Sequence, residues 1–242
     1  MILHSKYKWI APVAAFAAIL VSCSRDIPHV AESDSDLSND ATVQVFSATL
    51  KAARNYVYID GTPVSGAAFA YQGVFPGTAP GFVVRPGMHA VSIKDTLGTS
   101  TQVALNYPQM FEAGKSYTIF TYDTITAIKQ KTVVNNITVP TDTTSMLRFA
   151  NLFYSTATVP AVDVYSYRRG AIVFTNVAGG QVTDFIPYAS QLTDTLYVYA
   201  AGTTSPLLVK SFVTSLSPQR SYTSAYNGSN SSAKTVTTFV TR

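Results

Sequence analysis

A repeat of about 105 residues is the feature that most constrains the fold of this chain. Ser116-Tyr117-Thr118 recurs as Ser221-Tyr222-Thr223, each time after a short turn-like segment. Self-similarity at a long fixed period indicates a repeated structural unit. The sequence therefore predicts two copies of one module, at residues 42–140 and 146–242, joined by a short polar linker at 141–145. Further matches keep nearly the same offset: Val43 to Phe46 with Leu147 to Ala150, Phe82 with Phe185, and Lys131 to Val133 with Lys234 to Val236.

Both copies are predicted to consist of β-strands. Charged residues make up only 12% of the chain, which contains 15 Tyr and 13 Phe and is rich in Thr and Val. Aromatic and β-branched residues favour strands, and no segment has a convincing helical period. In the first copy, alternation of apolar residues indicates one buried face that carries Val57, Ile59, Val91, Ile93, Tyr117 and Ile119. We expect an all-β protein with two tandem immunoglobulin-like antiparallel β-sandwiches.

Turn residues divide each copy into about seven short strands. In the first copy, Asn55 to Ile59 is followed by Asp60-Gly61, a pair typical of a tight hairpin. We predict the strands of the first copy at residues 55–59, 67–71, 81–85, 89–94, 101–105, 116–124 and 131–139. Those of the second copy are predicted at residues 162–167, 171–176, 182–186, 195–200, 207–212, 221–227 and 234–240.

The first 22 residues are predicted to be a secretory signal peptide. A basic segment with Lys6 and Lys8 precedes the apolar run Ile10 to Val21, which is shorter than the roughly 18 residues that a membrane span needs. Leu20-Val-Ser-Cys23 resembles the lipobox of bacterial lipoproteins. That resemblance implies that Cys23 receives a diacylglycerol, that the peptide before it is removed, and that the lipid holds the protein in a membrane. Ser24, rather than aspartate, follows Cys23, which favours the outer membrane of the cell envelope by analogy.

The segment from Cys23 to residue 41 is predicted to be a disordered tether, because it is polar and has no sustained apolar period. Cys23 is the only cysteine, so no internal disulfide is expected. The formal net charge of +4 falls to about +2 once Lys6 and Lys8 leave with the signal. Lys and Arg are also dispersed along the sequence, and nucleic acid is therefore not an expected partner.

The two repeats resemble a family of bacterial surface modules known as domain of unknown function 4397. The resemblance rests on Tyr56-Val-Tyr-Ile-Asp60-Gly61, on the later turn Arg85-Pro-Gly87, and on Ala161-Val-Asp163-Val-Tyr165 in the second copy. The second copy departs from the family pattern where Ser166-Tyr-Arg-Arg-Gly170 replaces the Asp-Gly turn. The resemblance implies immunoglobulin-like sandwiches in a lipoprotein, and it implies no reaction.

Few residues in the two copies are suited to catalysis, and we expect no enzyme, no cofactor and no metal site. His89 is the only histidine in the copies, and no free cysteine remains to complete a zinc site with the usual spacing. A Ser-His-Asp site would need His89, which we interpret instead as a surface residue next to a turn. Asp60 and Asp95 are an alternative carboxylate pair for glycoside hydrolysis, but nothing in the sequence fixes their separation.

Two other patterns suggest surface features. Three pairs of tyrosines each share one face of a strand and suggest an aromatic surface that stacks on sugar rings: Tyr56 with Tyr58, Tyr165 with Tyr167, and Tyr197 with Tyr199. The first two pairs are the candidate binding residues. The alternative explanation is ordinary cross-strand packing. Four Asp-Thr triplets resemble a bacterial O-glycosylation acceptor, which would modify Thr96, Thr124, Thr143 and Thr195.

The sequence thus favours a non-catalytic, lipid-anchored envelope protein that acts as a surface spacer, adhesion or interaction module. The alternative is a glycan- or peptide-binding accessory lipoprotein of a nutrient-uptake system. Its expected partners are a membrane, contacted through the N-terminal lipid, and a glycan or protein ligand.

Overall fold

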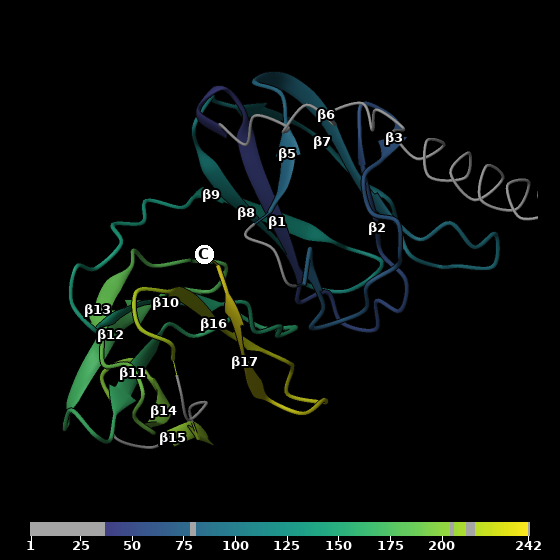
Figure 1. The fold of residues 1–242 in the computed structure, drawn as a ribbon. Helices are drawn as coiled ribbons and strands as arrows, with labels where there is room; N and C mark the ends of the chain where they lie inside the picture. Colours follow the sequence, from purple (N-terminus) through teal and green to yellow (C-terminus); the bar gives the residue numbers. More distant parts are fainter. Residues whose placement is uncertain (1–36, 78–80, 204–205, 212–215, 242) are drawn as a thin grey trace, which may run out of the picture. The chain divides into compact units, whose positions relative to one another are not determined.

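Four β-sheets make up the part of the chain described by the computed structural model, which covers residues 37–77, 81–203, 206–211 and 216–241 (Figure 1). The predicted signal peptide, Cys23 and most of the predicted tether lie outside the described residues. The described part begins with a short 3-10 helix, η1 (Leu37–Asn39), and contains no helix long and apolar enough to cross a membrane.

The first repeat contributes two of the sheets. One sheet has the order β4-β1-β8-β9, with β5 also paired to β1, and the other has the order β3-β2-β6-β7. Their strands are β1 (Ala41–Ser47), β2 (Tyr56–Ile59), β3 (Thr62–Pro63), β4 (Val74–Phe75), β5 (Phe82–Val84), β6 (Gly87–Lys94), β7 (Leu105–Phe111), β8 (Ser116–Tyr122) and β9 (Lys129–Val134).

The second repeat contributes two corresponding sheets, with the orders β13-β10-β16-β17 and β12-β11-β14-β15. Their strands are β10 (Ser145–Asn151), β11 (Val162–Ser166), β12 (Ala171–Val177), β13 (Ile186–Tyr188), β14 (Thr195–Ala200), β15 (Pro206–Ser211), β16 (Ser221–Asn227) and β17 (Thr235–Val240). The predicted all-β class is therefore confirmed. Below, residues 37–140 are called the first half and residues 141–242 the second half.

One strand pair in each half is parallel, so the prediction of purely antiparallel sheets was wrong in this detail. β1 runs parallel to β8 with Val43 opposite Tyr117, and β10 runs parallel to β16 with Leu147 opposite Tyr222. Turn chemistry in the sequence indicates hairpins between neighbouring strands. It carries no signal for a strand that pairs with a distant one in the same direction.

The strand registers also change which residues of the two repeats correspond. Phe82 lies opposite Val43, and the corresponding residue opposite Leu147 is Ile186 rather than the predicted Phe185. Lys131 lies opposite Phe120, and the corresponding strand pair in the second half is Thr237 with Ala225. The predicted match of Lys131 with Lys234 was thus wrong by three residues. Val43 and Phe82 are as far apart in sequence as Leu147 and Ile186, so matching by residue type alone, and not a difference in loop length, misplaced Phe185.

Most predicted strands are present, but two in the first half and one in the second are not. In the second half, the strand predicted at 182–186 is replaced by β13, which begins at Ile186, and Val182 forms only a single bridge with Ala150. The predicted strand at 101–105 is replaced by β7, which begins at Leu105 and contains Pro108. Proline obscured this strand because it lacks a ladder donor, and it is accommodated here because β7 pairs only with β6 at the edge of the sheet. The segment predicted at 67–71 forms only a single bridge, between Phe69 and Asn55.

The predicted hairpin at Asp60-Gly61 is confirmed. β2 and β3 pair with Ile59 opposite Thr62, so Asp60 and Gly61 are the two central residues of the turn. Their φ angles are 50° and 80°, as a type I′ turn requires, and this turn matches the twist of the strands that it joins.

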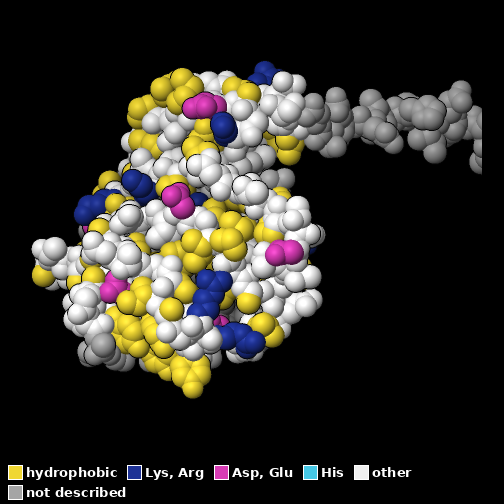
Figure 2. Space-filling model, turned by 90° about the vertical axis from the view of Figure 1, so that its left-hand side faces the viewer, with side chains coloured by type: hydrophobic (Ala, Val, Ile, Leu, Met, Phe, Trp, Pro, Cys, Tyr) yellow, Lys and Arg dark blue, Asp and Glu magenta, His cyan; other side chains and the backbone are white. Residues whose placement is uncertain are grey.

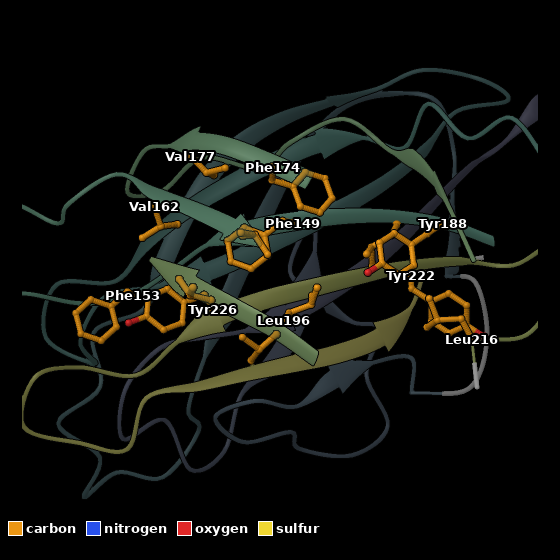
Figure 3. Packing of buried hydrophobic residues seen from close by; sticks show 14 residues of the cluster. Phe149, Phe153, Val162, Phe174, Val177, Tyr188, Leu196, Leu216, Tyr222 and Tyr226 are labelled. Carbon is orange, nitrogen blue, oxygen red and sulfur yellow. The ribbon is translucent and has the colours of Figure 1, made fainter. Parts of the chain in front are cut away.

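Each half buries its own apolar core between its two sheets. The first core contains all six residues predicted to share a buried face, together with Val43, Val45 and Phe111. In the second core, Phe149 on β10 packs against Phe174 on β12 of the facing sheet (Figure 3). The same facing sheet also contributes Val162 from β11 and Leu196 from β14. Sheets that bury one face against each other in this way form β-sandwiches.

A third apolar cluster joins the two halves. Phe46 and Phe120 of the first half pack against Phe239 of the second, and the rings of Phe46 and Phe239 stack with centroids 4.8 Å apart. This junction cluster, completed by Ala48, Ala150, Leu152 and Ala225, is buried. Residues Leu37–Arg242 thus form one compact unit, and the division into two tandem domains stays a prediction.

Equivalent residues of the two repeats make polar contacts across the same junction. Gln44 on β1 donates a hydrogen bond to the carbonyl oxygen of Val240, at 3.0 Å. The corresponding residue on β10 is Arg148, whose Nη2 donates to Thr118 Oγ1 at 2.9 Å. Arg148 is 2% exposed and lies over the rings of Phe120 and Phe185. Burial lowers the pKa of Arg148 to about 9, so the guanidinium still carries its charge at neutral pH.

Candidate functional site

His89 and Asp60 form a close pair of ionisable side chains at the β2–β3 turn. His89 Nδ1 lies 2.6 Å from Asp60 Oδ2, and His89 Nε2 lies 2.9 Å from the carbonyl oxygen of Arg85. Asp60 Oδ1 also accepts the backbone N–H of Ala90, and this bond, with that from His89, lowers the pKa of the carboxyl. Both ring nitrogens are therefore occupied by acceptors, and neither faces a serine or threonine hydroxyl. The pair ties the β2–β3 turn to β6 and does not have the geometry of a nucleophile-activating dyad.

The carboxylates are engaged separately rather than in pairs. Asp95, the second acid of the candidate carboxylate pair, accepts the backbone N–H of Leu97 at 2.9 Å, and its Oδ1 lies 3.8 Å from Arg54 Nε. The hydrogen bond from Leu97 is the main cause of its lowered pKa. Asp60 is held by His89 and Ala90 instead. Among the described residues, no group of three His, Cys, Asp or Glu side chains is placed to hold a metal ion.

The four predicted glycosylation sites all follow an aspartate that caps a turn. Thr96 and Thr143 are exposed, whereas Thr124 and Thr195 are half-buried. The aspartates accept backbone N–H groups within two residues: Asp95 from Leu97, Asp123 from Thr124, Asp142 from Thr144 and Asp194 from Thr195. Each aspartate thus has a structural role in its turn that does not depend on glycosylation of the following threonine. O-glycosylation stays a prediction.

Tyr56 and Tyr58 lie on one face of β2 as predicted, each beside a cation. Arg54 Nη2 donates to the hydroxyl of Tyr56 at 3.4 Å, and Lys94 Nζ lies 4.5 Å from the ring centroid of Tyr58. Tyr58 and Lys94 border a shallow groove of about 690 Å³ over β6 and β7. The two rings are not stacked on each other, and their cation–π contacts stabilise the outer face of this sheet.

Tyr165 belongs to a larger aromatic group on the outer face of the β12-β11-β14-β15 sheet. It lies opposite Tyr197 on β14, and the ring centroids of the two are 6.2 Å apart. Tyr199, on the same face of β14, lies 6.0 Å from Tyr197 with nearly parallel rings and 6.1 Å from Tyr165. We call Tyr165, Tyr197 and Tyr199 the tyrosine face. Figure 2 shows hydrophobic side chains gathered at the lower end of its view, the level at which Figure 1 draws β14 and β15.

The structure corrects one member of the predicted aromatic surface. β11 ends at Ser166, so Tyr167 lies in the following turn, where it is 69% exposed. Tyr165 is joined instead by Tyr197 and Tyr199 from the neighbouring strand, and by Ile172, which lies opposite Tyr165 on β12 and is 51% exposed. Alternation within one strand predicts shared faces only as far as the strand extends. The strand order, which supplies the other members, is not contained in that local pattern.

These observations define an all-β protein with a β-sandwich fold whose candidate site is an aromatic sheet face. No protein-family model matches the chain, and no curated protein matches it either, so the resemblance to domain of unknown function 4397 stays a prediction. Among solved structures, the Bacillus anthracis TIE protein aligns with 78% of this chain at 13% identity and a TM-score of 0.25. The chain covers 34% of the length of that protein.

Proposed function

We propose that this protein is a non-catalytic, lipid-anchored component of a bacterial cell envelope that acts as a surface spacer, adhesion or interaction module. The observation that carries the proposal is the junction cluster. Phe46, Phe120 and Phe239, together with buried Arg148, couple the two halves through both apolar and polar contacts. A body coupled in this way holds its outer faces at a fixed separation, which suits a spacer or a presenting module.

The predicted lipobox supports the anchoring part of this proposal. A signal peptide that ends just before Cys23, followed by a polar tether and a folded β-body, is the arrangement expected for a protein carried outside the cytoplasm on a lipid. The acyl chains of such a lipid contribute about 0.8 kcal/mol for each buried methylene, so two or three chains retain a protein in a membrane leaflet without a spanning helix.

Metabolic labelling with an alkyne-bearing fatty acid tests the anchor. We expect the full-length protein to be labelled and to fractionate with outer membranes. A Cys23→Ser variant should be unlabelled, while the matched Ser24→Ala variant, which keeps the cysteine, should be labelled as the unaltered protein is. An unlabelled parent protein, or label that persists in Cys23→Ser, would contradict lipidation at this residue.

The tyrosine face favours a second candidate function, that of a glycan- or peptide-binding accessory lipoprotein in nutrient uptake. Aromatic rings on a solvent-facing sheet offer flat apolar surface to the C–H faces of sugars and to apolar peptide side chains. If this face binds ligand, a Tyr197→Ala variant should lose retention on an array of glycans and peptides. A Tyr58→Ala variant, altered on the other outer sheet, should keep it. Equal retention by all three proteins would argue against this function.

A further inference from the structure

A cleft between the two halves is a separate candidate for ligand binding. It has a volume of about 680 Å³, within the range of roughly 300–1,000 Å³ found for small-molecule sites. Loops of both repeats line it, with Leu50, Tyr71 and Thr124 from the first half and Tyr154 and Ser229 from the second. None of these residues is among the predicted binding residues, and Thr124 is a predicted glycosylation site.

The repeat places equivalent residues on opposite sides of this cleft. In the first half, Leu50 after β1 forms a parallel bridge with Thr124 after β8. In the second half, Tyr154 after β10 forms the corresponding parallel bridge with Ser229 after β16. The cleft is therefore lined by the same strand ends of both repeats, and it exists only because the two halves are joined.

Hydrogen bonds across the junction fix the walls of the cleft. The hydroxyl of Tyr71 donates to Asn227 Oδ1 at 2.8 Å, and Gln72 Nε2 donates to the same oxygen at 3.0 Å. Asn227 is itself buried, and its Nδ2 donates to the carbonyl oxygen of Ala225 and to Thr237 Oγ1. A site whose walls are held before binding loses less conformational entropy when a ligand enters.

The chemistry of the lining identifies the class of ligand. Hydroxyl groups come from Thr124, Thr126, Ser229, Ser231 and Ser232, and aromatic rings come from Tyr71 and Tyr154. The one charged side chain in the lining is that of Lys51, and no carboxylate is part of it. Hydroxyls donate and accept hydrogen bonds, and rings contact C–H surfaces. This combination matches a neutral, polyhydroxylated molecule better than a multiply charged anion or a metal-bridged sugar.

We propose that the cleft binds a short neutral oligosaccharide. The inference rests on the proposed role as an envelope interaction module and gives that module a ligand class and a binding site. It also separates this site from the tyrosine face, which lies on the outer sheet of the second half. The rings of the cleft would contact the sugar, and the serine-rich segment after Gly228 would supply the exchangeable hydrogen bonds.

A glycan array probed with the purified mature protein tests this proposal. The array carries neutral cello-, xylo-, manno- and malto-oligosaccharides beside uronic-acid and sulfated glycans. We expect retention on at least one neutral series. Ser232→Trp, which fills the cleft from an exposed position, should weaken retention at least tenfold. The matched Thr99→Trp, at an exposed position outside the cleft, should leave retention unchanged. Thermal unfolding of both variants would show that each is folded.

Three results would overturn the proposal. These are retention on no neutral glycan, retention only on the anionic glycans, and retention that survives Ser232→Trp but is lost in Tyr197→Ala. The last result would assign binding to the tyrosine face instead. Labelling at Cys23 is measured on the same preparation, so a failure of sugar binding is distinguished from a failure of the anchoring proposal.

Discussion

Asp194 is a buried carboxylate held entirely by hydrogen bonds. The hydroxyls of Ser166 and Tyr188 donate to Oδ2, and the backbone N–H groups of Arg168 and Thr195 donate to Oδ1. Burial alone would raise the pKa of Asp194, but these four bonds lower it by more. Burial, together with the hydrogen bond to Asp194, raises the pKa of Tyr188. Asp194 thus fixes the turn after β11 and the start of β14.

The lowered pKa of Asp194 has a defined consequence for stability. Because the folded protein binds this proton less tightly than the unfolded chain, the stabilisation is present above the ordinary pKa of 3.8 and is lost as pH falls through the lower folded value. Asp194→Asn should reduce the free energy of unfolding by about 2 kcal/mol at pH 7, since a neutral amide cannot accept all four bonds.

Chemical denaturation at pH 7 and pH 3 measures this effect. The difference between Asp194→Asn and the parent protein should shrink at pH 3. Asp142→Asn is the matched control, because Asp142 is exposed and bonds only to Thr144. A difference for Asp194→Asn that stays the same at both pH values would show that the ionised carboxylate is not the stabilising form.

At the scale of single elements, the β2–β3 turn depends on glycine at one position. Gly61 has a φ of 80°, and a Cβ placed there would meet no atom within 4 Å. Gly61→Ala should therefore cost about 1 kcal/mol of stability from backbone strain alone. Gly66→Ala is a matched control, since Gly66 also has open space around its Cα and has no positive φ. Urea denaturation of the two variants separates strain from added bulk, and equal stabilities would contradict a strained turn.

Strand prediction succeeded where alternation and turn residues agree. The predicted bounds of β14 and β16 match the structure residue for residue. It failed at β7, because Pro108 argues against a strand although this edge strand contains it. It also failed at 67–71, where Phe69 forms a single bridge with Asn55 and no ladder follows. Parallel pairing of β1 with β8 could not be predicted, because alternation specifies which face is buried and not which strand lies alongside.

Prediction of candidate sites from the sequence had the same limit. Tyr165 was correctly placed on a sheet surface, but its ring partners Tyr197 and Tyr199 depend on the order of strands. The cleft was missed because its lining residues are unremarkable in sequence and are brought together only by the joining of the halves. A signal was present nonetheless. The repeat equates Leu50 with Tyr154 and Thr124 with Ser229, which places all four at corresponding strand ends.

At the scale of the whole molecule, the junction cluster should make the two halves unfold together. The ring of Phe239 stacks on that of Phe46 and lies 6.4 Å, between centroids, from that of Phe120. Truncation of a buried phenylalanine lowers the free energy of unfolding by about 3–5 kcal/mol. We expect the parent protein to unfold in one calorimetric transition. Phe239→Ala should lower its midpoint and divide it into two transitions, one for each half.

Phe174→Ala provides the comparison for this experiment. Phe174 is buried to a similar degree, but it lies in the core of the second half, away from the junction cluster. Its truncation should reduce stability while the single transition is kept. Two transitions in the parent protein itself would show that the junction does not couple the halves.

The register of the strands places the start of β1 and the cleft at opposite ends of the first half. The chain enters the first half at Ala41, next to Ser116, whereas Leu50 and Thr124 lie at the other end of the same two strands. β1 spans seven residues, and a strand rises about 3.3 Å per residue, so roughly 20 Å separates the two ends. The start of β1 and the strand ends that line the cleft therefore lie on opposite sides of the first half. A ligand would reach the cleft at the end of these strands that is remote from the start of β1.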